Sequence, residues 1–152
     1  MQIWYTGCNC CHQMIFAMTH LKAVIVDEER LARVNLRRLL GEYPEIEIAG
    51  EADSCESAIK LINQNNPQVV FLDIQLRGET GFDLLEYLDK PISIIFVTAY
   101  EKNAINHIEA ESIDYLSKPV NPERLKEAVE MVMKLNIQSE MRNEELCLSN
   151  YL

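Results

Sequence analysis

The sequence predicts an α/β fold in which helices cover both faces of a parallel sheet. Short apolar runs alternate with amphipathic stretches between residues 21 and 135. This alternation is typical of parallel sheets, because the chain must cross over one face of the sheet before it starts the next parallel strand. The runs at 24–26, 69–72 and 92–97 are almost wholly apolar. They are therefore expected to be central strands, buried on both faces.

The more polar stretches at 46–51 and 113–117 are expected at the edges of this sheet. With the apolar runs in the centre, the predicted strand order is 2-1-3-4-5. This is the doubly wound, flavodoxin-like arrangement of five parallel strands. Ligands of such sheets bind beyond the carboxyl ends of the strands, at the point where the first and third strands diverge.

The predicted helices carry their own start and stop signals. Asp53 and Glu56 have the spacing of a helix start, and Asn121 followed by Pro122 is typical of an N-cap and a first helical residue. Gly41 ends the first helix. Helices are expected at 29–42, 53–64, 81–88 and 121–135, a weaker helical pattern covers 100–110, and residues 75–80 are expected to form a loop.

Polar side chains follow four of the predicted strands. Asp27 and Glu28 follow the first strand, Asp73 the third, Thr98 the fourth and Lys118 the fifth. An isolated carboxylate is costly to bury, so each acid should lie where its strand meets water or a cation. Three carboxylates that converge at the switch point need a countercharge. Oxygen ligands with retained waters favour Mg²⁺, with Mn²⁺ as the alternative.

Together these groups suit phosphoryl transfer to Asp73. A carboxylate can act as the nucleophile, the Lys118 ammonium can meet a phosphate oxygen, and the Thr98 hydroxyl can donate a hydrogen bond. Each residue by itself is more often structural, because a strand-end Asp commonly caps a helix and a Lys before Pro is commonly solvated. The complementary set at four strand ends favours the phosphoryl site.

Residues 21–135 resemble a response-regulator receiver domain of two-component signalling. The resemblance rests on four ordered motifs: Val26-Asp27-Glu28, Leu72-Asp73-Ile74, Val97-Thr98-Ala99 and Tyr115-Leu116-Ser117-Lys118-Pro119. The last two motifs, with their neighbouring residues, are most similar to receivers that precede a LytTR-type DNA-binding domain. The chain departs from the family at Glu28, where Asp is usual.

The resemblance implies a phosphoacceptor signalling domain rather than an enzyme, one that assists its own phosphorylation and dephosphorylation. Asp73 would accept the phosphoryl group from a sensor histidine kinase, and Lys118 would bind the phosphate. Thr98 and Tyr115 would form the switch pair. The implied metal ligands are all oxygen donors: Asp27, Glu28, Asp73 and the backbone carbonyl of Gln75.

Specific residues argue against two alternative functions. A haloacid-dehalogenase-type phosphatase also forms an aspartyl phosphate, but it needs a second Asp two residues on as its general acid and base. This chain has Gln75 there, which cannot transfer that proton. A receiver-like docking module that works without phosphorylation would have lost Asp73 or Lys118, and both are present.

The net charge of −10 argues against direct nucleic-acid binding by this chain, because phosphate backbones are bound through Lys and Arg. Leu31 and Val34 are expected on an outer side of the first helix, where a partner kinase could dock. A weak homodimer is expected through the fourth helix, strand five and the last helix. The apolar contacts of the fourth helix would be Ala104, Ile105 and Ile108.

The two ends of the chain differ from residues 21–135. Residues 1–20 contain no Lys, Arg, Asp or Glu, and are expected to be an unstructured or loosely packed extension. Cys8, Cys10, Cys11 and His12 lie in it, but no second ligand pair follows them, so a zinc site is not expected. Residues 136–152 are expected to be a polar tail or a truncated linker. The cysteines show no disulfide framework and no apolar stretch is long enough to span a membrane, which predicts a cytoplasmic protein.

Overall fold

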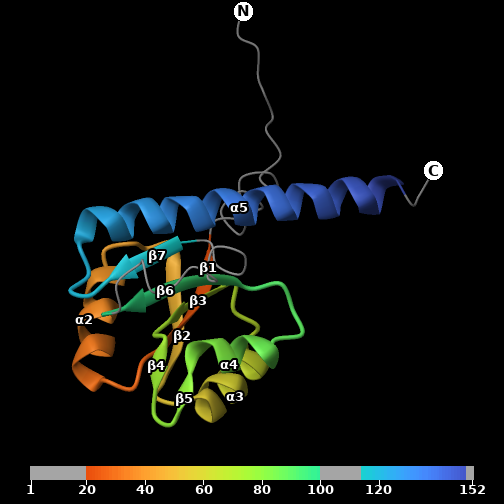
Figure 1. The fold of residues 1–152 in the computed structure, drawn as a ribbon. Helices are drawn as coiled ribbons and strands as arrows, with labels where there is room; N and C mark the ends of the chain where they lie inside the picture. The colour runs from red at the N-terminus through yellow and green to blue at the C-terminus, as the bar shows by residue number, and fades with distance from the viewer. Residues whose placement is uncertain (1–19, 100–113, 150–152) are drawn as a thin grey trace, which may run out of the picture.

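The computed structural model describes residues 20–99 and 114–149, and it has the predicted parallel sheet. The sheet order is β2-β1-β3-β6-β7, which corresponds to the predicted order 2-1-3-4-5 (Figure 1). All four strand pairs of this sheet are parallel. The strands are β1 (Leu21–Val26), β2 (Ile46–Ala52), β3 (Val69–Leu72), β6 (Ser93–Thr98) and β7 (Asp114–Ser117).

The helices form two layers, one on each face of the sheet (Figure 1). They are α2 (Arg30–Leu40), α3 (Cys55–Asn65), α4 (Gly81–Glu86) and α5 (Pro122–Ser149). α2 and α5 lie on one face, and α3 and α4 lie on the other. Residues 75–80, predicted as a loop, form a small antiparallel pair, β4 (Gln75–Leu76) and β5 (Glu79–Thr80).

Each face of the sheet has its own hydrophobic core. Along β1, Ala23 and Ile25 pack against the α2 and α5 layer, whereas Val24 and Val26 pack against the α3 and α4 layer. Successive side chains of a strand point to opposite faces, so a strand covered on both faces must be apolar throughout. This confirms the prediction that the apolar runs are the central strands.

Two predicted helix boundaries differ from the structure. The N-cap of α3 is Ser54 rather than Asp53, because Ser54 and Ser57 form a reciprocal capping box in which each side chain accepts from the other's backbone N–H. The last helix was expected to end near Leu135, but α5 continues to Ser149. No Gly or Pro follows Leu135 to stop it, so 136–149 is helix rather than an irregular tail.

Strand β2 contains a bulge that changes which side chains face which layer. Ala23 of β1 pairs with Ile48, but the next residue, Val24, pairs with Gly50, so Ala49 is the extra residue. Ile48 before the bulge packs against the α2 and α5 layer, and Ala52 after it packs against the α3 and α4 layer. In a regular strand these two residues would share a face.

Several predictions fall outside the described residues: the extension at 1–19 with its cysteines, and the fourth helix at 100–110 with its apolar contacts. Within the part of the chain that the structure describes, no helix is long and apolar enough to cross a membrane. The division into an extension, a receiver unit and a tail stays a prediction.

Candidate functional site

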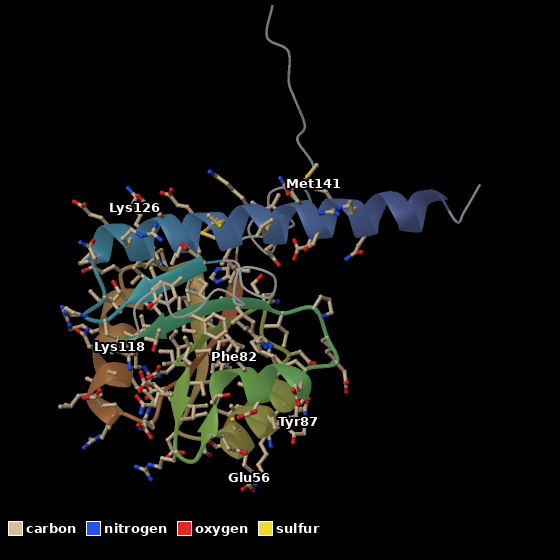
Figure 2. The ribbon with its side chains drawn as sticks, viewed as in Figure 1. Glu56, Phe82, Tyr87, Lys118, Lys126 and Met141 are labelled. Carbon is tan, nitrogen blue, oxygen red and sulfur yellow. The ribbon has the colours of Figure 1, made fainter. Side chains whose placement is uncertain are left out.

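Three of the predicted site residues meet at the carboxyl-terminal edge of the sheet. Asp27 follows β1, Asp73 follows β3 and Lys118 follows β7. The Lys118 Nζ lies 2.5 Å from Asp27 Oδ2 and 2.7 Å from Asp73 Oδ2. Figure 2 shows Lys118 at this edge, next to α2. The two carboxylates are 4% and 5% exposed, so the lysine is their countercharge in an almost closed site.

Backbone hydrogen bonds join the four strand ends in two pairs. The Asp73 N–H donates to the Val26 carbonyl at 2.9 Å, which joins the ends of β1 and β3. The Lys118 N–H donates to the Thr98 carbonyl at 2.9 Å, which joins the ends of β6 and β7. The peptide bond between Lys118 and Pro119 is cis. The pairing of the strands therefore fixes the backbone positions from which Asp27, Asp73 and Lys118 project.

The second oxygen of each carboxylate is also occupied. Asp27 Oδ1 accepts from the Glu29 N–H at 2.8 Å, and Asp73 Oδ1 accepts from the Gln75 N–H at 3.1 Å. In both cases an Asp side chain binds the backbone two residues on, which is the Asx turn. The two carboxylates are thus oriented with Oδ1 toward the backbone and Oδ2 toward Lys118.

The surroundings of the site shift the pKa of Asp27 and the pKa of Lys118. Burial raises the pKa of Asp27, although the hydrogen bond from Lys118 acts in the opposite direction. Burial also favours neutral Lys118, but the hydrogen bonds and charges of Asp27 and Asp73 outweigh it and raise the pKa of the ammonium. Lys118 therefore stays charged at neutral pH.

Glu28 is the predicted ligand that the structure does not bring into this cluster. Its side chain is partly exposed. Among residues 20–99 and 114–149, no three His, Cys, Asp or Glu side chains lie close enough together to hold a metal ion. The predicted convergence of three carboxylates is thus seen for Asp27 and Asp73 only.

The two buried carboxylates fit a divalent cation. Asp27 Oδ2 and Asp73 Oδ2 both reach one nitrogen, so a small cation could contact both oxygens in the same place. Mg²⁺ is usually held by one or two carboxylates and keeps several waters. Gln75, whose backbone carbonyl was the fourth predicted ligand, lies in β4 with an exposed side chain.

The predicted switch residues lie on neighbouring strands. Thr98 ends β6 and is fully buried. Tyr115 lies in β7 opposite Phe96 and is partly buried against the α3 and α4 core. Thr98 pairs with Ser117, the residue before Lys118, and Tyr115 lies two positions earlier on the same strand.

Gly81 packs directly against Asp73, a contact that sequence patterns did not indicate. A Cβ atom at Gly81 would lie 2.5 Å from the Asp73 backbone oxygen, and the Gly81 N–H donates to the Ile74 carbonyl at 2.7 Å. Only glycine allows α4 to approach the strand end this closely. A glycine at the first position of a helix is the sequence signal that could have indicated this contact.

Arg33 is a second residue that sequence patterns did not indicate, and it contacts the backbone at the end of β1. Its Nη1 donates to the Asp27 carbonyl at 2.7 Å, and its Nε lies 3.3 Å from Glu51 Oε2. Glu51 belongs to β2, so this contact depends on the strand register. No local pattern in the sequence joins Arg33 to either partner.

A cavity of about 230 Å³ lies beside the charged cluster, between α2 and the segment that follows β7. Asp27 and Lys118 line its polar end, and Leu31, Ala32 and Pro119 are among its apolar lining residues. Leu31 is 74% exposed and Val34 is 51% exposed, which confirms that they lie on the outer side of this helix. The cleft is therefore bordered by an exposed apolar surface.

The comparisons with known proteins agree with this geometry. Residues 23–130 match the response regulator receiver domain, and the chain belongs to this family of two-component signalling domains. The sensory transduction protein LytT of Bacillus anthracis is 41% identical over 128 residues, which are 82% of this chain and 52% of that protein. An uncharacterized response regulatory protein of Vibrio cholerae is 41% identical over 122 residues, 79% of this chain and 52% of that protein.

The fold is also seen in solved receiver domains. The REC domain of AraT, a response regulator from Geobacillus stearothermophilus, has a TM-score of 0.70 and 29% sequence identity. The likeness covers 79% of this chain and 98% of that domain. The chain spans about half the length of the curated relatives it matches.

Proposed function

We propose that this receiver domain accepts a phosphoryl group on Asp73 from a histidine kinase. The observation that carries the proposal is the geometry at the sheet edge: a buried carboxylate held 2.7 Å from the Lys118 ammonium, with a second buried carboxylate on the same nitrogen. A purely structural ion pair needs one acid for each lysine. The second acid is surplus to that role and suits the binding of a cation.

In the proposed transfer, an Asp73 carboxylate oxygen attacks phosphorus of a phosphohistidine. An O–P bond forms, the P–N bond breaks, and the electron pair leaves with the imidazole nitrogen. Lys118 swings from Asp27 toward the incoming phosphoryl oxygens and neutralises their charge. The Gln75 N–H keeps Asp73 oriented through the transfer.

Asp27 and Asp73 would hold Mg²⁺, or Mn²⁺, with the Gln75 carbonyl as a further oxygen donor, and Glu28 would join them only if its side chain moved toward the cluster. When bound, the ion supplies charge neutralisation for the phosphoryl oxygens. Two carboxylates beside one lysine leave a net negative charge at the site, which a bound divalent cation would neutralise.

The partner kinase is proposed to dock on the exposed face of α2. Leu31 lines the cavity that also contains Asp27 and Lys118, and Val34 is exposed on the same helix. A partner helix laid against them would bring its phosphohistidine to the cleft. α2 contains no acidic residue and exposes Arg30 and Arg38, so its outer face favours a partner with acidic residues around that contact.

Phosphorylation is proposed to act through Thr98 and Tyr115. The new phosphoryl oxygens would draw the Thr98 hydroxyl toward Asp73, and Tyr115 on the neighbouring strand would follow. This would remodel the surface of β7 and α5 and favour a weak homodimer there. A local charge that biases a two-state element is the form that such switches take.

The test is the phosphoryl mass gain of Asp73→Asn. Wild type, incubated with Mg²⁺ and acetyl phosphate, should gain one phosphoryl group by intact mass, and Asp73→Asn should gain none. Asp89→Asn is the matched control, because Asp89 is an exposed Asp outside the site. Comparable labelling of Asp73→Asn and wild type would refute the assignment.

A further inference from the structure

Arg33 reaches from the first turn of α2 back to the end of β1. Its Nη1 donates to the Asp27 carbonyl oxygen at 2.7 Å, and its backbone N–H donates to the Glu29 carbonyl at 3.2 Å. The side chain is 16% exposed, so this cation is largely removed from water. Arg33 thus holds both ends of the segment from Asp27 to Glu29, which we name the acidic loop.

The orientation of the Arg33 guanidinium is set by a second contact. Its Nε lies 3.3 Å from Glu51 Oε2, while the other oxygen of Glu51 lies 2.7 Å from Arg37 Nη1. A guanidinium is a planar fork that can bind two partners in different directions, which a lysine ammonium on a flexible stem does less well. Glu51 therefore fixes the orientation of the Arg33 guanidinium that binds the Asp27 carbonyl.

The bulge in β2 is what makes this contact available. It shifts the pairing by one residue between Ala23 and Val24, so that the residues beyond it change faces. Glu51 follows the bulge and meets Arg33 and Arg37 of α2. Bulges are known to re-aim side chains next to functional sites. Without this one, Glu51 would point toward the α3 layer.

We propose that Arg33 is a positioning residue for the cation site, oriented by Glu51, that holds the acidic loop in the shape needed to bind the metal. The inference deepens the proposed function and rests on it for its metal-binding consequence. Arg33 touches the backbone of Asp27 and not its carboxylate. It acts by fixing the strand end from which the ligand side chain projects.

The sign of the effect separates positioning from simple electrostatics. Arg33 is a cation close to a site that binds a cation, so removing its charge should tighten Mg²⁺ binding if only the Coulomb interaction matters. If Arg33 positions the loop, its removal should weaken Mg²⁺ binding instead. Outer-shell partners of metal ligands typically change affinity by about tenfold or more.

The experiment measures Mg²⁺ binding by calorimetry in wild type, Arg33→Gln, Arg33→Lys and Glu51→Gln. We expect the dissociation constant to rise about tenfold in Arg33→Gln and less in the other two. Arg38→Gln is the matched control, since Arg38 is an exposed arginine of the same helix that contacts Asn35. Far-UV circular dichroism checks each fold, and Glu51→Gln carries the test if Arg33→Gln does not fold.

A second measurement needs no metal. The Glu29 N–H, which donates to Asp27 Oδ1, should exchange with solvent about tenfold faster in metal-free Arg33→Gln than in Arg38→Gln, which is the order of the affinity change expected above. Unchanged or tighter Mg²⁺ binding with unchanged exchange would overturn the positioning role. If wild type binds no Mg²⁺, the proposed metal site fails, and the exchange rate still decides whether Arg33 holds the loop.

Discussion

Replacing Lys118 with methionine tests the charge balance on which the site depends. The substitution keeps a long unbranched side chain and removes the ammonium between Asp27 and Asp73. The two carboxylates, 4% and 5% exposed, would then face each other without the cation that lies between them. They must repel each other, take up a proton or move apart.

The size of the effect follows from burial. Removing one member of a buried ion pair typically costs about 3–5 kcal/mol. The Lys118 side chain retains 18% exposure, so water partly relieves the loss, and the lower end of that range applies. We expect Lys118→Met to lose about 3 kcal/mol at pH 7. At roughly 3–4 °C per kcal/mol for a domain of this size, Tm should fall by about 10 °C.

The pH dependence has a definite sign. Because burial raises the pKa of Asp27, the folded protein holds this proton more tightly than the unfolded chain does. Ionising Asp27 therefore costs stability, and the cost is absent below the ordinary pKa of an Asp and complete above the raised pKa. Without Lys118 the cost is larger. The stability difference between wild type and Lys118→Met should thus be greatest near pH 7 and shrink toward pH 4.

Urea unfolding followed by circular dichroism at several pH values measures this difference. Lys126→Met is the control, because Lys126 lies on the outer side of α5 (Figure 2) and should change stability by less than about 0.5 kcal/mol. Mg²⁺ should stabilise Lys118→Met more than wild type, since it would replace the missing countercharge. A variant as stable as wild type at pH 7, or a difference independent of pH, would refute the reasoning.

Three further predictions concern the surroundings of the site. Gly81→Ala should destabilise the domain by about 2 kcal/mol or more and slow Asp73 phosphorylation, because its Cβ would press on the Asp73 backbone. Gly78→Ala is the control for labelling only: Gly78 has open space but a φ of 73°, so this substitution should cost stability through backbone strain and keep the labelling rate. Val34→Asp should slow transfer from the kinase and spare acetyl phosphate labelling, and equal loss in both would argue against docking there. Sedimentation should show self-association with beryllofluoride that Thr98→Ala weakens; a monomer in both states at high concentration would reject the dimer.

Much of the fold follows from local patterns of this chain. Val69 to Leu72 is apolar on both faces, and such a run is stable only between two layers. The strand order followed because the polar stretches suit the two edges. Asp27, Asp73 and Lys118 were predicted to meet because the carboxyl ends of parallel strands share one edge. These inferences need only the periodicity of consecutive residues and the topology that the order of the elements implies.

The extent of α5 shows a limit of that reasoning. The inner apolar stripe of this helix ends near Val132, so the helical pattern weakens there although the helix continues to Ser149. A burial pattern reports where a helix packs, whereas its end depends on a stop signal. The sequence contains no such signal before Ser149, and the polar character of 136–149 concealed the helix.

The contacts that hold Asp27 and Asp73 in place are visible only in the tertiary structure. Arg33 meets Glu51 because a one-residue bulge in β2 changes the face of every residue after it. Gly50 inside a strand is a general sign of a bulge, but it does not say which side chains the bulge brings together. Glycine is needed at position 81 because α4 begins so close to Asp73 that a Cβ atom would lie 2.5 Å from the Asp73 backbone oxygen. Such contacts depend on the register and separation of distant segments, which arise from packing of the whole chain rather than from the preference of any one stretch.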